Sequence, residues 1–332
     1  MLRQQDVGHR IVVRRIVGIR EGRPLFSDAL GELVELSETH LTLATAQGPL
    51  RVPMAQVHRA KRVPPTRRPT AAAVVALERA ADEAWPAPTR GRLGDWLLRS
   101  AEGWTGRANS ALPIGDPDRP LPAAVDAVER WYADRGQPAM INTPLPLAAP
   151  VGAELDERGW GSRPPTLVQI APLPLAMPTP GPTPPTGGTP LPGAAGAHRA
   201  VIEVATAPSD EWLAVAAGRK GGLPDAARHV LTAVDQVCFA HAYVDGTLVA
   251  IGRGTVTGQG RWLGLSLIEV LPPLRRQGLA RRVIDTLAEW GASAGATHAF
   301  LQVEQHNAAA VALYRTLGFT THHTYLTRVA PH

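Results

Sequence analysis

The sequence predicts a mixed α/β protein in three folded parts: a small β unit, a first α/β unit and a second α/β unit. Three observations predict this organisation. Residues 7–63 contain short strand patterns without a helical period, the chain beyond residue 71 alternates helical and strand patterns, and a charge-free, proline-rich stretch lies within residues 164–197. With 332 residues, of which 44% are hydrophobic, the chain is long enough to bury a core in more than one part.

Residues 1–66 are predicted to form an SH3-like β-barrel. The segments HRIVVRRIVG and GELVELSETHLTLATAQGPLRVPMAQVHRA alternate β-branched and polar residues, with turn residues between the strands. A segment of about 60 residues suits a small barrel better than a two-sheet sandwich. Residues 1–68 carry 12 Arg or Lys against 6 Asp or Glu, so this part is basic. A solvated charged face is the simpler interpretation, and contact with nucleic acid is the alternative.

Residues 71–172 are predicted to form the first α/β domain. AAAVVALERAADEAW and LPAAVDAVERWYADRG have apolar residues at helical spacing and many strong helix formers. LGDWLLRSAEGWTGRANSALP, AMINTPLP and TLVQIAPL have the character of strands. The segment ELDERGWG is predicted to be a helix that stops at a glycine.

Residues 173–198 are predicted to be a linker, because nine prolines occur between residues 172 and 192. Such a composition favours extended, semi-stiff chain and cannot bury enough surface to fold. The second α/β domain is placed at residues 199–330. There, AVIEVATAP, HAFLQVEQHN and TTHHTYLTRV are predicted strands, a strand meander spans residues 236–273, and Val-Asp-Gly-Thr at 244–247 marks a hairpin.

Composition also limits the classes of function. The single cysteine, Cys238, excludes an internal disulfide and a zinc site built from several thiolates, and it is expected to be a buried small hydrophobe. No metal is expected. No run approaches the roughly 18 apolar residues of a membrane span, and MLRQQDVGHRIVV lacks the pattern of a signal peptide. We therefore expect a cytoplasmic protein without a membrane partner.

The junction VLPPLRRQGLARRV, at residues 270–283, is the strongest candidate for a ligand site. Pro272 and Pro273 cannot donate hydrogen bonds to a sheet, so a strand should end at Val270, and a helix should begin near Gln277. The first turn of that helix has amides without carbonyl partners and the positive end of the helix dipole, which together suit a phosphate. Four arginines, Arg275, Arg276, Arg281 and Arg282, add positive charge. An ordinary strand-to-helix loop with surface arginines is the alternative.

VLPPLRRQGLA resembles the V-x-P-x-x-R-x-x-G-x-G/A frame of the GNAT acyltransferases, with Arg275, Gly278 and Ala280 at the pyrophosphate-loop positions. About 30 residues further on, NAAAVALYRTLGF at 307–319 resembles the second signature of that family, N-x-x-A-x-x-L-Y-x-x-x-G-F. Arg276 departs from the family, which often has glycine there. The resemblance covers residues 200–330. It implies a GNAT fold for that part. SAEGWTGRANSALP, VERWYADRGQP and ELDERGWG in the first half resemble a degenerate copy of the same fold, with WYADRG in the place of LYRTLG and no counterpart of RRQGLA.

The order of the parts also resembles an actinobacterial tandem-GNAT group described as histone-acetyltransferase-like, with an SH3-like N-terminal domain. The resemblance implies that acetyl-CoA is the acyl donor and that its pantetheine arm lies between two splayed strands. The implied cofactor contacts are Ile268, Glu269 and Val270 in the strand, Arg275, Arg276, Gln277, Gly278, Leu279 and Ala280 in the loop, and Asn307 and Tyr314 in the following helix.

The resemblance implies that Tyr314 is the general acid toward the CoA sulfur, and that the Val270 N–H is the oxyanion donor. Glu269 is the candidate general base, with Glu304 and the pair His322 and His323 as rivals.

In the first half, Arg107, Asn109 and Ser110 are candidates for substrate contact, with purely structural hydrogen bonds as the alternative. The predicted function is an acetyl-CoA-dependent N-acetyltransferase. It would act on a primary amine of a protein lysine, an N-terminus or a small molecule, by direct transfer in a ternary complex. The alternative is a non-catalytic CoA-sensing or nucleic-acid-associated binding protein.

Overall fold

The structure is a computed structural model that describes residues 2–20, 22–45, 48–63, 69–176, 200–220 and 223–331, without the side chains of 219 and 220. Contacts divide the chain into two compact units, Met1–Arg68 and Pro69–His332, and each is described by itself. Most of the predicted linker, residues 177–198, lies outside the described residues.

The first unit is a single antiparallel sheet of five strands, β1 (Arg10–Arg20), β2 (Arg23–Leu36), β3 (His40–Thr45), β4 (Gly48–Pro53) and β5 (Val57–Arg62). The strands follow the order β4-β3-β2-β1-β5, and no pairing of β4 with β5 occurs among the described residues. The prediction of a closed SH3-like barrel is therefore not confirmed, because the sheet remains open. β5 has no fully buried residue and β4 has only Val52, so little apolar surface favours closure.

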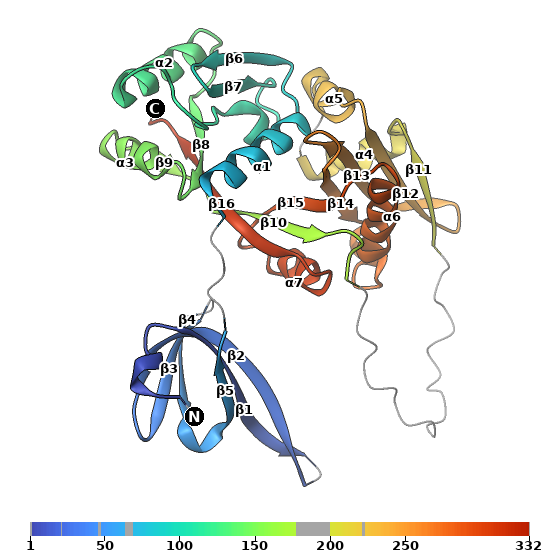
Figure 1. The fold of residues 1–332 in the computed structure, drawn as a ribbon. Coiled ribbons are helices and arrows are strands. Elements are labelled where there is room, and N and C mark those ends of the chain that lie inside the picture. Colours follow the sequence, from blue (N-terminus) through green and yellow to red (C-terminus); the bar gives the residue numbers. More distant parts are fainter. Residues whose placement is uncertain are drawn as a thin grey trace. The chain divides into compact units, whose positions relative to one another are not determined.

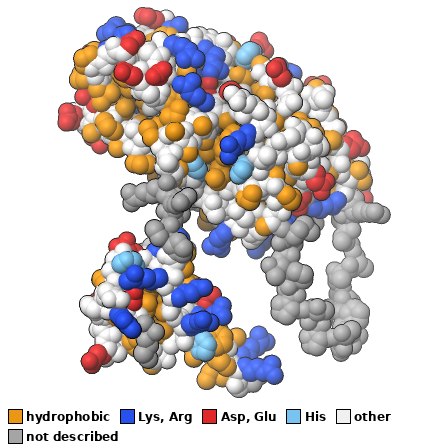
Figure 2. Space-filling view, in the orientation of Figure 1, with side chains coloured by type: hydrophobic (Ala, Val, Ile, Leu, Met, Phe, Trp, Pro, Cys, Tyr) orange, Lys and Arg blue, Asp and Glu red, His pale blue; other side chains and the backbone are white. Residues whose placement is uncertain are grey.

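The β1–β2 hairpin of the first unit exposes several large hydrophobic side chains, including Val17, Ile19, Leu25 and Phe26. Figure 2 shows hydrophobic and basic side chains side by side on the visible face of this unit. Arg14 and Asp28 pair across the hairpin at 2.9 Å. Nucleic-acid binding by this unit stays a prediction that rests on charge alone.

The second unit is built on one nine-stranded sheet (Figure 1) with the order β11-β12-β13-β14-β15-β10-β16-β8, in which the short strand β9 also pairs with β16. Its strands are β8 (Met140–Leu145), β9 (Gly161–Ser162), β10 (Thr166–Pro172), β11 (Val201–Ala205), β12 (Val237–Val244), β13 (Thr247–Thr257), β14 (Trp262–Val270), β15 (His298–Glu304) and β16 (Thr320–Val329). Among the strand pairs of this sheet that the structure describes, only β14–β15 is parallel.

The two sequence halves of this unit share the sheet by interleaving strands. β10, from the first half, lies between β15 and β16 and pairs antiparallel with both. β16, at the end of the second half, pairs in turn with β8 of the first half. The boundary predicted between residues 172 and 173 stays a prediction, but side chains of both halves can reach a common site because they stand on a common sheet.

The remaining elements of the first half are α1 (Ala71–Glu83), the hairpin β6 (Thr89–Leu93) and β7 (Trp96–Ser100), α2 (Leu121–Ala133) and α3 (Ala149–Glu157). Thr70 caps α1, because its side chain accepts a hydrogen bond from the Ala73 amide. The long segment predicted as strand-like is strand only at its start, since Arg107–Asn109 form a short 3₁₀ turn.

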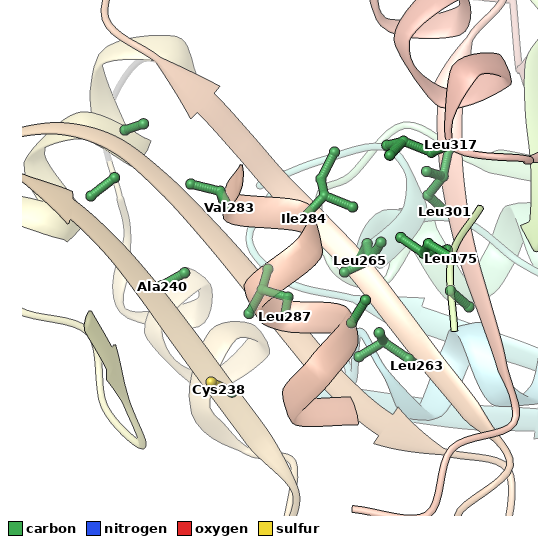
Figure 3. Packing of buried hydrophobic residues seen from close by; sticks show 14 of the residues in the cluster. Leu175, Cys238, Ala240, Leu263, Leu265, Val283, Ile284, Leu287, Leu301 and Leu317 are labelled. Carbon is green, nitrogen blue, oxygen red and sulfur yellow. The ribbon is translucent and has the colours of Figure 1, made fainter. Parts of the chain in front are cut away.

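The second half adds α4 (Asp210–Lys220), α5 (Asp225–Thr232), α6 (Leu279–Ser293) and α7 (Ala308–Thr316). Figure 3 shows α6 against the sheet, with Val283, Ile284 and Leu287 packed in a cluster with Leu263 and Leu265 of β14. Cys238 lies in the same cluster and is buried, as predicted. Burial raises the pKa of this thiol to about 11, so it is an uncharged core residue at neutral pH.

Candidate active site

A gap opens between the adjacent parallel strands β14 and β15. They pair only from Trp262 opposite His298 to Leu265 opposite Leu301, although β14 continues to Val270 and β15 to Glu304. Beyond Leu265, β14 keeps its antiparallel partner β13, and β15 keeps its partner β10. The carboxyl-terminal parts of β14 and β15 are therefore splayed, with main-chain groups along both edges.

A β-bulge in β14 accompanies the splay. Ile251 of β13 lies opposite Glu269 and Arg253 lies opposite Ser266, so β14 has one residue more than its partner over this interval. Leu267 within the bulge has a positive φ of 53°, a strained conformation for a leucine. Strain of this kind persists where the surrounding structure holds it. No signal in the sequence indicated the bulge.

The main chain of Val270 faces the gap. The amide of the next residue, Leu271, donates to the Val249 carbonyl of β13 at 2.9 Å. Because successive main-chain groups of a strand point to opposite sides, the N–H and C=O of Val270 point away from β13. The carbonyl accepts a hydrogen bond from Arg275 Nε at 3.0 Å. The N–H of Val270 is thereby directed at the space between the strands.

The loop after β14 leads into the N-terminus of α6. A 3₁₀ turn at Pro272–Leu274 follows the strand, and α6 begins at Leu279, two residues later than predicted. The delay has a backbone cause, because Arg276 (φ 64°) and Gly278 (φ 81°) both adopt left-handed conformations that a helix cannot contain. The hydrogen-bond ladder starts with Arg282 N donating to Gly278 O at 3.1 Å, so the amides before it lack helical acceptors.

These amides and the dipole of a 15-residue helix form an anion-binding geometry. Gly278 is needed for its positive φ and not for lack of room, since a Cβ at this position would have nothing within 4 Å. Arg276 occupies a left-handed position that glycine would accept more easily, which gives a physical reason for the family preference at this point.

Three of the four arginines near the loop have structural partners. Their donors bond to backbone carbonyls: Arg275 to Val270 (3.0 Å), Arg281 to Ala176 (3.3 Å) and Arg282 to Ala200 (2.6 Å). Arg276 is exposed. The predicted positive charge is therefore present, and most of it is held in fixed positions.

Helix α7, which follows β15, places Asn307 and Tyr314 at the gap. Asn307 is the N-cap, and its Oδ1 accepts a hydrogen bond from the Ala310 amide at 3.2 Å. Tyr314 is half-buried, and its ring packs against Phe319 with centroids 5.9 Å apart. The seven-residue spacing predicted one helical face for the two residues, and both line the same cavities.

Two cavities meet at the gap. The larger, of about 1220 Å³, is bounded by the end of β14, the loop, α4, α6 and α7. All predicted cofactor contacts except Gln277 line it: Ile268, Glu269, Val270, Arg275, Arg276, Gly278, Leu279, Ala280, Asn307 and Tyr314. The smaller cavity, of about 240 Å³, lies over β14, β15 and first-half residues. The residues common to both are Ile268, Asn307, Ala310 and Tyr314, so the cavities adjoin.

The two carboxylate candidates for a general base stand on different cavities. Glu269 lines the larger one, one residue before Val270. Glu304 is exposed at the smaller one, and its Oε2 lies 3.3 Å from His306 Nε2.

The two histidine candidates line neither cavity. His323 is buried, and its Nε2 lies 2.6 Å from Oε1 of Glu78 on α1. His322 Nδ1 is 2.8 Å from His323 Nδ1. Burial, and to a lesser degree the neighbouring His323, lower the pKa of His322. This chain of groups joins β16 to α1, and the role of the two histidines as rival bases stays a prediction.

The three first-half candidates for substrate contact lie in different environments. Arg107 lines the smaller cavity. Asn109 is buried and organises the preceding loop, accepting from the amides of Ala101 and Gly103 and donating to two carbonyls. Ser110 accepts a hydrogen bond from Arg99 at 3.1 Å. The structural alternative therefore holds for Asn109 and Ser110.

Several lining residues of the smaller cavity were missed by sequence reasoning: Trp85, Arg163, Gln302 and Tyr325. They come from four separate segments, which meet only because β10 and β16 interleave with the strands of the other half. No local pattern in the sequence marks them.

Within the described residues, no cluster of three or more His, Cys, Asp or Glu side chains could hold a metal ion. Among the helices of the described ranges, none has the length and apolar character needed to cross a membrane.

The splayed strands, the bulge and the amide-rich loop define a GCN5-related N-acetyltransferase fold. The solved structure of a GCN5-related N-acetyltransferase from Kribbella flavida superimposes with a TM-score of 0.56 at 17% identity, covering 80% of this chain and 97% of that one. This likeness establishes the fold alone.

A model of the family described as "Probable histone acetyltransferase Rv0428c C-terminal" matches residues 71–160 and 190–327, and the chain belongs to that family. The probable histone acetyltransferase Rv0428c of Mycobacterium tuberculosis is 29% identical over 266 residues, 76% of this chain and 72% of that protein. The uncharacterized N-acetyltransferase YobR of Bacillus subtilis is 29% identical over 257 residues, 74% of this chain and 93% of that protein. The protein is thus an acyltransferase enzyme, an acetyltransferase of GNAT type.

Proposed function

We propose that the protein is an acetyl-CoA-dependent N-acetyltransferase that transfers the acetyl group directly to a primary amine in a ternary complex. The meeting of the two cavities at Tyr314 carries this proposal. Direct transfer requires donor and acceptor to be bound together with their reacting atoms in contact. Two cavities that adjoin at shared residues provide places for both substrates at once.

The larger cavity is the proposed donor site. Bound acetyl-CoA supplies the activated acyl group as a thioester. The amides at the start of α6 would bind its diphosphate, and the main-chain edge of Ile268 to Val270 would bind the pantetheine arm. The positive φ of Gly278, the open space beside it and the fixed arginines support this assignment.

The smaller cavity is the proposed acceptor site. Of the proposed catalytic groups, Tyr314 lines both cavities, and Glu269 and Val270 line the larger one. The Val270 N–H would stabilise the negative charge that develops on the acyl oxygen. Tyr314 would give its proton to the departing sulfur. Glu269 is the proposed base that takes a proton from the amine, and Glu304 on the acceptor side is the alternative.

A non-catalytic CoA sensor is the competing hypothesis. A sensor needs one cavity for the nucleotide, whereas the second cavity beside Tyr314 favours turnover. The name of the mycobacterial relative suggests a histone as the acceptor of that protein. Lysines, N-termini and small amines all fit the proposal at this level.

A thiol-release assay with acetyl-CoA and mixed amine acceptors tests the proposed function. We expect release of free CoA that depends on the acceptor and saturates with it. Tight acetyl-CoA binding without release on any acceptor would favour the sensor instead.

A further inference from the structure

The inner part of the smaller cavity is positively charged. Its charged lining residues are Arg107, Arg163 and Glu304. Glu304 is exposed and lies beside His306, so its charge is largely screened by solvent. Of the two arginines, Arg163 is exposed, whereas Arg107 lies deeper.

Arg107 is a half-buried cation that lacks a carboxylate partner among the described residues. No ion pair within 4.0 Å joins it to a described carboxylate, and its Nε is shielded from solvent with no hydrogen-bond partner among the described residues. The guanidinium interacts with the Tyr325 side chain, and the nearby carboxylate of Glu78 is hydrogen-bonded to His323 at 2.6 Å. The guanidinium lies 5.1 Å from the ring centroid of Trp85. A buried donor without a partner is costly, and a ligand that supplies the missing acceptor removes that cost.

Arg163 extends the same positive wall. Its Nη1 would lie 2.8 Å from a Cβ added to Gly106, the residue before Arg107. The glycine therefore lets the guanidinium of Arg163 rest against the loop that presents Arg107. Planar guanidinium groups of this kind suit carboxylates, which they can bind through two parallel hydrogen bonds.

The rest of the wall is uncharged and combines apolar residues, among them Leu265, Leu301 and Val303, with neutral polar ones. Thr166, Ser266 and Thr327 line it, together with Tyr325 and Gln302, which are joined by a hydrogen bond of 3.2 Å. Tyr314 and Asn307 lie at the junction with the donor cavity. An acceptor could thus place its amine at that junction and an anionic group against the arginines.

We propose that the acceptor is a small molecule that carries a carboxylate in addition to its primary amine, and that Arg107 and Arg163 bind the carboxylate. This inference rests on the proposed function and adds the substrate class. A cavity of about 240 Å³ suits a small molecule of this size. A lysine side chain of a basic peptide is disfavoured, because its flanking cations would meet the two arginines.

Matched acceptors test the substrate class. Thiol release from acetyl-CoA is measured with a series of amino acids, including glycine, β-alanine and lysine, with the amide of each, and with a lysine peptide whose termini are blocked. We expect kcat/KM to be about 10- to 100-fold higher for the carboxylates than for their amides, as the loss of a charge-assisted hydrogen bond predicts. Equal rates for acids and amides, or preference for the blocked peptide, would overturn the substrate class and leave the acetyltransferase proposal standing. Release with none of these amines would overturn both proposals.

Variants assign the effect to the arginines. Arg163→Gln, on an exposed residue, should raise KM about tenfold for the carboxylate acceptor and leave KM for the amide nearly unchanged. Arg107→Gln should raise KM for the carboxylate acceptor by more than Arg163→Gln does, and should likewise leave KM for the amide nearly unchanged. Thermal unfolding checks that this variant is folded. Arg79→Gln, on the exposed face of α1 and outside both cavities, is the matched control and should change neither. If both cavity variants weaken acid and amide equally, the arginines do not bind the carboxylate.

Discussion

Replacing Tyr314 with phenylalanine should lower kcat for acetyl transfer by about 100-fold or more, while acetyl-CoA affinity changes little. The hydroxyl is the only atom lost, so the ring keeps its packing against Phe319, 5.9 Å away between centroids. Without the proton donor, the sulfur must leave as an unprotonated thiolate. Steady-state thiol release gives kcat, and calorimetric titration with acetyl-CoA gives the affinity separately.

Tyr243→Phe is the matched control for this experiment. Tyr243 lies on β12 and lines neither cavity, so the loss of its hydroxyl should leave kcat unchanged. The assignment of Tyr314 as the acid is contradicted if its phenylalanine variant keeps full kcat. It is also contradicted if the loss of activity is matched by an equal loss of acetyl-CoA affinity.

Replacing Arg253 with methionine should destabilise the second unit by at least about 3 kcal/mol, or about 6 °C or more in Tm. Arg253 is 1% exposed and donates only to neutral oxygens. Its backbone acceptors are Leu231 (2.8 Å), Ala84 (3.0 Å) and Val230 (3.2 Å). These carbonyls stand at the C-terminal ends of α5 and α1, where helices leave carbonyls unsatisfied and the dipole favours a cation.

Methionine has a similar volume but no donor, so it leaves these carbonyls buried without partners. Part of the cost is offset, because burying the charge is itself unfavourable, and burial lowers the pKa of Arg253 to about 9. Thermal unfolding of the whole chain measures the effect, with Arg79→Met on exposed α1 as the control. An unchanged Tm would show that the guanidinium is dispensable at this position. Arg253 also joins α1 of the first half to β13, so its loss should disturb the acceptor side as well.

Most residues that line the proposed donor cavity could be predicted from the sequence because they are local in the chain. These residues lie in two short segments, Val270 to Ala280 and Asn307 to Tyr314. In these segments proline ends a strand, glycine adopts a left-handed conformation and asparagine caps a helix. The helix start was misplaced at Gln277 because positive φ at Arg276 is not visible in its residue type. The residue types around Leu267 likewise do not predict the bulge in β14.

The acceptor side could not be predicted because it depends on contacts between distant segments. Trp85, Arg163 and Tyr325 meet through the interleaving of β10 and β16, a property of the whole sheet. The expected closure of the N-terminal barrel failed for a related reason. Strand patterns predict which face of each strand is buried, whereas closure depends on pairing between β4 and β5 at the two ends of the order.

Calorimetric titration of the whole protein with acetyl-CoA tests the central claim most directly. The account predicts measurable binding that falls at least about 100-fold in Gly278→Glu, because the added carboxylate would stand among the amides proposed to bind the diphosphate. Gly278→Ala, which has the same backbone strain without the charge, should lose no more than about tenfold. No heat of binding in the unaltered protein, or equal affinity in Gly278→Glu, would contradict the account.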